Sequence, residues 1–309
     1  MIIVSDRKAS DIKIFDMKGK LIKTLGRKGP GPGELNFPYC CAYQFPYLAV
    51  FDFGKRQIII FKQTGISDFE YLKQILCVGL GSDIALSGES VIVSGYTRDK
   101  NAKEYGIYKI NLQTLEKKEI LPIERKYNLD SYTKYKNLYD KSFLTIGTGG
   151  YIALCKQFLY SIWEGDLVIS RIGSDGIISF GEKTKNYSAP QATAEWKKAY
   201  KEMNGRQYDQ ECKNFSSIIG IFANDDFIGV LYGNYSNEFS RWEIYLQLYN
   251  SRDNQFLKEL KLPGAVDESD SQPYHSFYFC KDKNVLYYIS RELSEDQDIY
   301  KIHQYQIQK

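Results

Sequence analysis

The side chains best suited to chemistry are few and scattered in this 309-residue chain. It contains two histidines, His275 and His303, and six cysteines without a C-x-x-C pair. Zinc sites and most acid–base sites need several such groups that converge. The G-x-S-x-G and H-E-x-x-H signatures are also missing from the sequence. We therefore predict no catalytic residue and no metal ligand.

Two aspartates recur at the ends of similar apolar strands. Asp6 follows IIVS, and Asp52 follows YLAVF. A carboxylate at such a place can bind a cation or a ligand, but more often it accepts hydrogen bonds from amides of the next loop. We favour this capping role and keep both residues as ligand-binding candidates.

The link GRKGPGPGEL (26–35) resembles a phosphate-binding loop only in its glycines. Phosphate loops lead into a helix, whereas apolar strand-like segments flank this one, and its prolines lack amide donors. We reject a phosphate role.

Composition limits the classes of partner. The net charge is only +3, and the basic residues of the first 28 positions alternate with acidic ones. A nucleic-acid surface needs a denser stripe of one sign, so we expect solvated strand faces and no nucleic acid. No window approaches the ~18 apolar residues of a membrane span. The spacing of the cysteines favours buried free thiols over zinc or a disulfide framework.

The strongest signal is an internal repeat of an apolar strand, a polar gap, a second apolar strand, a tight turn and a third strand. Six copies start near residues 2, 47, 90, 151, 227 and 285. The first intervals match the roughly 40–50 residues of a four-stranded propeller blade. A further apolar segment lies between copies and is expected to be the innermost strand of each next blade: 38–43, 82–87, 142–147, 216–223 and 275–280.

The turns agree with this pattern. MKG, QTG, GSDG and NSRD join the second and third strands of several copies, and such residues close tight hairpins. With 26 Tyr and 17 Phe, the composition also favours strands. We predict an all-β fold, a six-bladed β-propeller that forms one domain over 1–309.

The run IIVSDRKASDIKIFDMKGKLIKTLGRKGPGPGELNFP (2–38) resembles an NHL/TolB-like blade. Its features are the strand-ending Asp, the I-x-x-F-D-x-x-G-K hairpin and the GPGE link. The version with GPGPGE is most similar to propeller proteins of Bacteroidetes-type bacteria, many of them lipoproteins. The match covers residues 2–62, and its motifs are structural.

This resemblance implies a leader and closing strands that the sequence does not contain. The chain begins at the second strand of its first blade and ends at the third strand of its last. We expect an N-terminal piece to be absent and the protein to lie outside the cytoplasm, periplasmic or anchored at the outer membrane. If Met1 is the true start, we expect a cytoplasmic protein.

Long connections are predicted at one face only. They include the links between the first and second strands of a copy, Thr97–Glu104 and Asn234–Arg241, and the stretch from Lys183 to Asn214. Within that stretch, about 190–212 between blades four and five, Trp196, Ala199, Tyr200 and Met203 have helical spacing. We expect a short helix there that packs on neighbouring loops or forms a lid.

Binding residues are expected on this loop-rich face, because rigid scaffolds commonly carry function on loops. Aromatic and Arg side chains are the usual anchors of recognition surfaces. The candidates are Asp6, Asp52, Arg56, Tyr96, Arg98, Trp163, Trp196, Arg206 and His275. A lone histidine is more often a hydrogen-bonded structural residue than an acid or base, and we favour the structural role for His275.

Two function classes follow. The favoured one is a monomeric, non-enzymatic module that binds a protein, peptide or glycan and needs no cofactor. The alternative is a hydrolase or lyase that uses Ca²⁺ at the channel mouth, because related propellers include metal-dependent lactonases and lyases. Asp, Glu and Asn ligands of calcium cannot be identified from sequence.

Overall fold

The protein is described from a computed structural model. The structure describes residues 1–16, 18–76, 81–99, 102–122, 150–163, 166–189, 194–195, 198, 210–267, 277–293 and 298–308. They form two compact units, Met1–Ser131 and Tyr132–Lys309.

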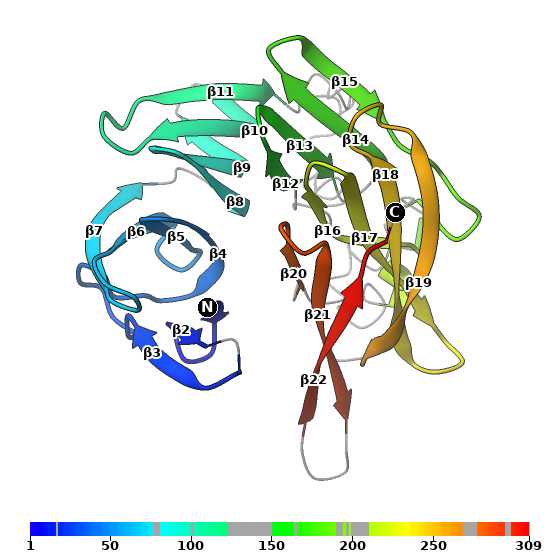
Figure 1. Ribbon diagram of the computed structural model, residues 1–309, viewed down its shortest axis with the longest axis horizontal. Coiled ribbons are helices and arrows are strands. Elements are labelled where there is room, and N and C mark those ends of the chain that lie inside the picture. The colour runs from blue at the N-terminus through cyan, green and yellow to red at the C-terminus, as the bar shows by residue number, and fades with distance from the viewer. Residues whose placement is uncertain are drawn as a thin grey trace. The chain divides into compact units, whose positions relative to one another are not determined.

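The first unit contains three antiparallel sheets (Figure 1). Its strands are β1 (Ile2–Asp6), β2 (Asp11–Phe15), β3 (Leu21–Leu25), β4 (Pro38–Gln44), β5 (Tyr47–Asp52), β6 (Gln57–Gln63), β7 (Phe69–Leu76), β8 (Gly81–Ser87), β9 (Ser90–Asp99), β10 (Ala102–Asn111) and β11 (Lys117–Pro122). The sheets are β1–β3, β4–β7 and β8–β11.

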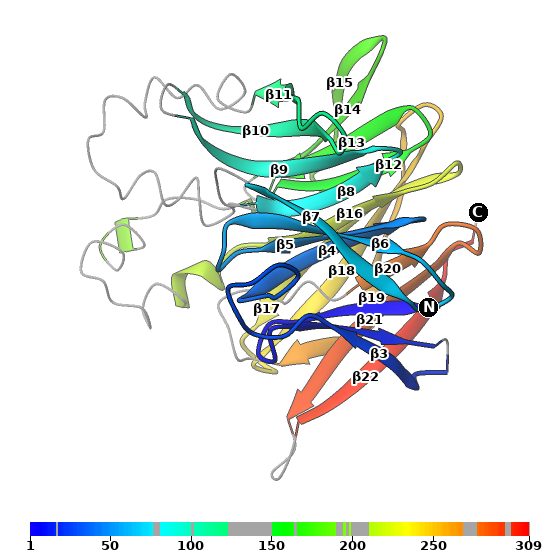
Figure 2. The same cartoon turned by 90° about the vertical axis from the view of Figure 1, so that its left-hand side faces the viewer.

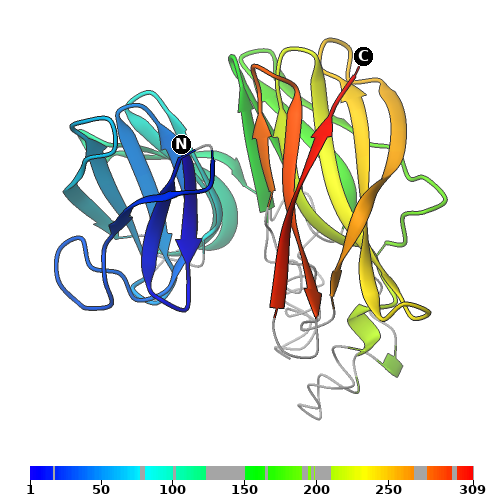
Figure 3. The same cartoon turned by 60° about the horizontal axis from the view of Figure 1, so that its bottom comes forward.

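The second unit also contains three antiparallel sheets, and its strands run side by side in Figure 3. They are β12 (Gly150–Cys155), β13 (Phe158–Trp163), β14 (Asp166–Gly173), β15 (Gly176–Phe180), β16 (Ser217–Ala223), β17 (Phe227–Ser236), β18 (Arg241–Asn250), β19 (Phe256–Asp267), β20 (Phe277–Cys280), β21 (Val285–Leu293) and β22 (Asp298–Gln306). The sheets are β12–β15, β16–β19 and β20–β22.

Within every sheet, each strand pairs with the next one along the chain. Six consecutive antiparallel meanders are the six blades that the repeat predicts, so the all-β prediction is confirmed. The first and last sheets have three described strands, and the other four have four. That the two units form one domain stays a prediction.

Alternate residues of the same strand build two separate cores in the first unit. In β5, Leu48 and Val50 pack with the buried residues of β2 and β6, whereas Ala49 and Phe51 pack towards β8 and β9. Successive side chains of a strand point to opposite faces of its sheet. A strand in a blade that has a neighbouring blade on each face must therefore be apolar on both faces. This explains the uninterrupted apolar run YLAVF.

The second unit repeats the arrangement in sheet β16–β19. Ile228 and Tyr232 of β17 face the core shared with β12–β14, whereas Leu231 faces the core shared with β20 and β21. Trp242 of β18 is almost fully buried in that second core. Aromatic residues therefore contribute to both cores that flank this sheet.

Two of the predicted long loops, Thr97–Glu104 and Asn234–Arg241, are hairpin ends in the described residues, so this prediction is wrong. Thr97–Glu104 is largely strand, since β9 and β10 stay paired up to Asp99 and Ala102 (Figure 2). In Asn234–Arg241, Asn234–Ser236 pairs with Arg241–Glu243 of β18, and only residues 237–240 form a turn. The side chains of Asn234–Arg241 are half-buried or exposed, so this hairpin end needs no apolar pattern.

The fourth blade differs from the prediction by one strand. The repeat predicts YIALC (151–155) as the second strand of the fourth blade, after an innermost strand at 142–147. In the structure it belongs to β12, the first strand of its sheet. The second strand of this sheet is FLYSIW, β13, where the repeat predicts no strand. The segment 142–147, predicted to be the innermost strand, lies outside the described residues.

The helical insertion is described only in part. Ala194, Glu195, Lys198 and the turn Gln210–Cys212 are helical, and all lie between β15 and β16. Trp196, Ala199, Tyr200 and Met203 lie outside the described residues, so the apolar stripe stays a prediction.

The segment that leaves β15 is fastened to sheet β16–β19 by one carboxylate. Glu259 of β19 accepts hydrogen bonds from Thr184 Oγ1 at 2.5 Å and from Asn186 Nδ2 at 2.6 Å. It also accepts from Tyr232 OH at 2.7 Å and from Gln247 Nε2 at 2.8 Å. Four donors on one carboxylate fix the path of the chain towards the insertion.

The cysteines are free thiols among the described residues: Cys40, Cys41, Cys155, Cys212 and Cys280. Burial raises the pKa of the Cys41 thiol to about 12 and also raises that of Cys155. The prediction of buried free thiols is thus confirmed for Cys155, whereas Cys40, Cys41, Cys212 and Cys280 are half-buried free thiols, and Cys77 lies outside the described residues. None of the helical segments that the structure describes has the length and apolar character of a membrane span.

We expect the Glu259→Gln variant to lose about 1–3 kcal/mol of unfolding free energy at pH 7, because a neutral amide cannot accept from all four donors. Burial raises the pKa of Glu259, but its hydrogen bonds outweigh burial and hold that pKa below the ordinary value. A carboxyl with a depressed folded-state pKa stabilises above the unfolded pKa and loses this effect as the pH falls. Urea unfolding should therefore show the difference at pH 7 and little of it at about pH 3. A difference that persists unchanged at the lower pH would contradict the role of the ionised form.

Candidate functional site

Two adjacent sheets of the first unit carry the same turn. The turns Asp6–Asp11 and Asp52–Gln57 each span four residues between paired ends. In each, the Asp accepts a hydrogen bond from the amide three residues on, and the residue before the second strand has positive φ, 59° at Ser10 and 55° at Arg56. The sequence repeat thus produces a repeated turn.

Asp52 is fully buried and works as a cap. Its carboxylate accepts hydrogen bonds from the amides of Asn36 at 2.6 Å, Phe37 at 3.1 Å and Lys55 at 3.0 Å. It joins its own turn to the chain that leads into β4. The predicted capping role is confirmed, since amide donors surround the carboxylate.

Asp6 has the same place in its turn but is partly exposed. It accepts hydrogen bonds from the Ala9 amide at 2.9 Å and from Lys13 Nζ. The Lys13 hydrogen bond is the main reason that the pKa of Asp6 lies below its usual range. Lys13 also bonds Asp11, so the two aspartates share one cation.

The Gly–Pro link between the first two sheets is closed by its own side chain. Glu34 accepts from the Gly31 amide at 2.7 Å and from Arg27 Nε at 2.8 Å. Lys55 Nζ donates to the carbonyls of Gly31 and Glu34, and Leu35 is fully buried. A carboxylate already occupies the loop, which agrees with the rejection of a phosphate site.

These bonds position an aromatic cluster. Phe37 and Phe53 are 38% and 40% exposed, and their ring centroids lie 5.9 Å apart at an interplanar angle of 65°. Tyr39 of β4 lies 6.2 Å from Phe53. The Arg7 guanidinium lies 4.2 Å from the centroid of Tyr39 and 5.9 Å from that of Phe37. We call Arg7, Phe37, Tyr39 and Phe53 the aromatic–arginine patch.

Three of the nine predicted residues lie at this patch. Asp6 precedes Arg7, Asp52 precedes Phe53, and Arg56 is exposed in the same turn as Phe53. For three others only the backbone is described: Tyr96 and Arg98 in β9 and Trp163 at the end of β13. The remaining ones, Trp196, Arg206 and His275, lie outside the described residues.

The patch residues were missed in the sequence, although a signal existed. Arg7 and Phe53 each follow the strand-ending Asp of the repeat. An Asp that turns inward to cap amides leaves the next side chain at the surface of the turn. Comparing the residue after each such Asp would therefore have found them.

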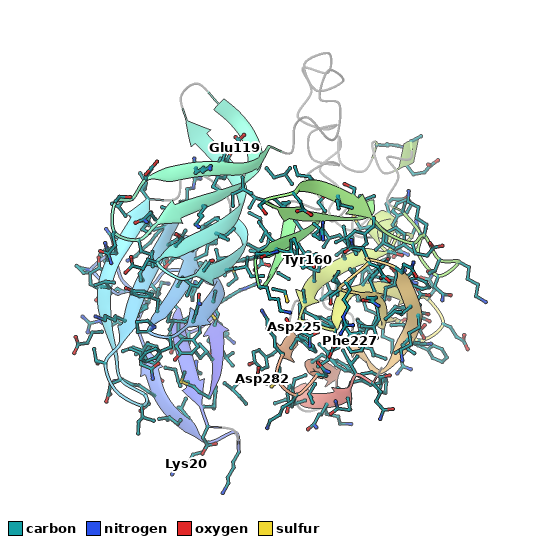
Figure 4. All side chains as sticks on the ribbon, turned by 45° about the horizontal axis from the view of Figure 1, so that its top comes forward. Lys20, Glu119, Tyr160, Asp225, Phe227 and Asp282 are labelled. Atoms are coloured by element: carbon teal, nitrogen blue, oxygen red, sulfur yellow. The ribbon has the colours of Figure 1, made fainter. Side chains whose placement is uncertain are left out.

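A second polar cluster lies in the other unit. Lys156 Nζ, in the β12–β13 turn, is 3.0 Å from Asp225 Oδ2, and Cys155 Sγ is 3.5 Å from Asp225 Oδ1. Figure 4 labels Asp225 near Phe227 at the β16–β17 turn. The exposed pair contributes little to stability, and its groups satisfy one another. Across the residues with described side chains, no three His, Cys, Asp or Glu are grouped to hold a metal ion.

No protein-family model and no curated protein matches the sequence. Solved structures do match the fold. One is a Bacteroides fragilis NCTC 9343 protein predicted to be exported, with TM-score 0.57 and 16% identity over 93% of this chain and 76% of that one. Another is Kuenenia stuttgartiensis hydrazine synthase, with TM-score 0.52 and 12% identity over 92% of this chain and 69% of that one. With its six successive blades, the protein is a six-bladed β-propeller.

We expect Asp52→Ala to lower the free energy of unfolding by about 3 kcal/mol, because three buried amides lose their acceptor. The equivalent change at the partly exposed turn, Asp6→Ala, should cost less than about 1 kcal/mol, since water can replace its bonds. Denaturant titration of both variants measures the two losses. Equal losses would contradict the structural difference between the two turns.

Proposed function

We propose that this propeller is a non-enzymatic binding module and that the aromatic–arginine patch holds a protein, peptide or glycan ligand. The observation that supports it is the exposed Phe37–Phe53 pair beside an Arg7 stacked on Tyr39. Aromatic rings and Arg are the side chains that most often dominate binding energy. Propellers supply rigid turns on which such groups can stand.

The rigidity of the patch supports this proposal. Phe53 donates its amide to the Phe37 carbonyl at 2.9 Å, and Asp52 bonds the Phe37 amide. Ser10 Oγ donates to the Asn36 carbonyl at 2.6 Å. A surface that is ordered before it binds loses less entropy on binding. Two exposed rings that the fold holds in place are therefore better suited to recognition than to packing.

We also propose that the protein acts outside the cytoplasm and is of the NHL/TolB-like type. The similarity of residues 2–62 to blades of lipoprotein propellers supports this, as does the shared fold with a Bacteroides fragilis protein predicted to be exported. The calcium-dependent hydrolase or lyase stays an untested alternative.

The double variant Phe37→Ser/Phe53→Ser tests the patch directly. We expect ligands selected from a phage-displayed random peptide library or a glycan array to bind it roughly thirtyfold more weakly, the loss of about 2 kcal/mol that a binding hot spot carries. The dissociation constants are measured by biolayer interferometry. Because each ring is still more than half buried, the variant should unfold at a lower temperature than the wild type, and binding is compared at a temperature where both are folded.

The matched control is Phe45→Ser/Ile66→Ser. These side chains are 73% and 95% exposed and lie in the β4–β5 and β6–β7 turns, at the other end of the strands from Phe53. It removes exposed apolar area elsewhere in the same sheet and should bind like the wild type. If the control loses binding and the patch variant keeps it, the patch is not the binding surface.

A further inference from the structure

We infer that the protein forms a weak symmetric dimer, in which the edge strand β15 (Gly176–Phe180) of one copy pairs antiparallel with β15 of a second copy. This inference goes beyond the proposed function, because β15 belongs to the second unit and the aromatic–arginine patch to the first. Three features of β15 support it: its open edge, its exposed apolar side chains and its lack of charge. The monomer expected from the sequence is then limited to dilute protein.

Strand β15 is the last strand of its sheet and has one open edge. All five of its residues pair with β14, from Gly176 with Gly173 to Phe180 with Ile169. Among the described strands, β14 is its only partner, and Figure 1 shows β15 beside it at the edge of the sheet. The side of a strand that faces away from its neighbour presents amide and carbonyl groups that can pair with another strand.

Exposed apolar side chains accompany this edge. Ile177 is 53% exposed and Ile178 is 42% exposed. Successive side chains of a strand point to opposite faces, so each face of β15 carries an exposed isoleucine. No residue of β15 is buried, whereas the last strands of the first three sheets and of the fifth each have a buried side chain: Leu25 of β3, Ile75 of β7, Leu121 of β11 and Leu262 of β19. The isoleucines of β15 therefore add apolar area to the surface instead of to a core.

The last strands of the other five sheets are charged. Each contains at least one lysine: Lys23 in β3, Lys73 in β7, Lys117 in β11, Lys258 in β19 and Lys301 in β22. Charged side chains on an edge strand, lysine above all, keep it from pairing with another chain. The five residues of β15, GIISF, contain no charged side chain. Of the last strands of the six described sheets, β15 alone lacks this protection.

A second copy is the occupant that fits an uncharged edge. When GIISF pairs antiparallel with itself, only Gly, Ile, Ser and Phe lie opposite one another, so no like charges meet. A twofold axis produces this pairing, because the same strand serves both copies. With the axis at the middle of the strand, Ile178 lies opposite Ile178 of the second copy. In the same arrangement of β3, which also has five residues, Lys23 would lie opposite Lys23.

The contact is small, so the dimer is weak. Stable protein–protein interfaces bury roughly 1,200 Å² or more, which is well beyond what two five-residue strands cover. Each backbone hydrogen bond across the axis adds only a modest net stabilisation. We expect a dissociation constant on the order of 100 μM, so that the protein is monomeric at about 1 μM and mostly dimeric at about 1 mM.

Sedimentation equilibrium of the full chain tests the dimer. We expect the weight-average mass to rise with concentration from the 35.8 kDa of one chain towards twice that value. Ile178→Lys should raise the dissociation constant about tenfold or more, because the symmetry brings two like charges together. The matched control is Ile22→Lys, which changes an isoleucine that is 46% exposed on the last strand of the first sheet and should associate like the wild type.

Mixing two charge variants tests the symmetric pairing itself. Ile178→Lys and Ile178→Glu should each stay monomeric at about 100 μM, and an equimolar mixture should form the dimer, because opposite charges then lie near one another across the axis. Sedimentation velocity with a fluorophore on one variant measures this. In hydrogen–deuterium exchange of the wild type, the amides of β15 should exchange more slowly at high concentration, and those of β3 should not change.

Three results would overturn this inference. A wild type that stays monomeric up to about 1 mM excludes the dimer. A dimer that survives Ile178→Lys, or charge variants whose mixture stays monomeric, excludes the pairing of β15 with itself. An equal loss in the Ile22→Lys control shows a general effect of charge and removes the special role of β15. Phe37→Ser/Phe53→Ser should associate like the wild type, so the proposed function stands or fails separately.

Discussion

The local structure of the first unit depends on one buried carboxylate. Asp52 accepts three backbone amides from two segments, its own turn and the chain that leads into β4. Burying an ionised carboxylate is costly unless hydrogen bonds surround it, so the site tolerates little change. These bonds fix the backbone of Phe37 and Phe53 relative to one another. The buried carboxylate therefore also holds the two exposed rings in position.

Much of the fold was predictable because each blade is formed by strands that are adjacent in the sequence, so its pattern can be recognised within a short segment. The strands of a blade that packs between two other blades must be apolar on both faces, and YLAVF and IIIF (58–61) show this without interruption. The turns repeat as well, since Asp6 and Asp52 bond the amide three residues on. The six meanders and the capping role of Asp52 followed from these two patterns.

The failures have a common cause. Where the end of a strand is half-buried or exposed, as in the β17–β18 hairpin, it lacks the apolar pattern that marks a strand and resembles a loop in sequence. FLYSIW was missed for a related reason, because the β12–β13 turn is too short to separate two apolar runs. Pairing with a neighbouring strand decides both cases, and a single sequence does not contain that information.

The site was harder to predict because sequence analysis selected the chemically conspicuous residues. Asp6 and Asp52 have charged groups at special positions, yet both are used to hold the turn. The patch is made by their neighbours, Arg7 and Phe53, together with Phe37 and Tyr39 at the start of β4. A repeated turn needs its cap in every copy but leaves the next side chain free to vary. Function in a propeller can therefore change at that position without cost to the fold, and this is where recognition residues are best sought.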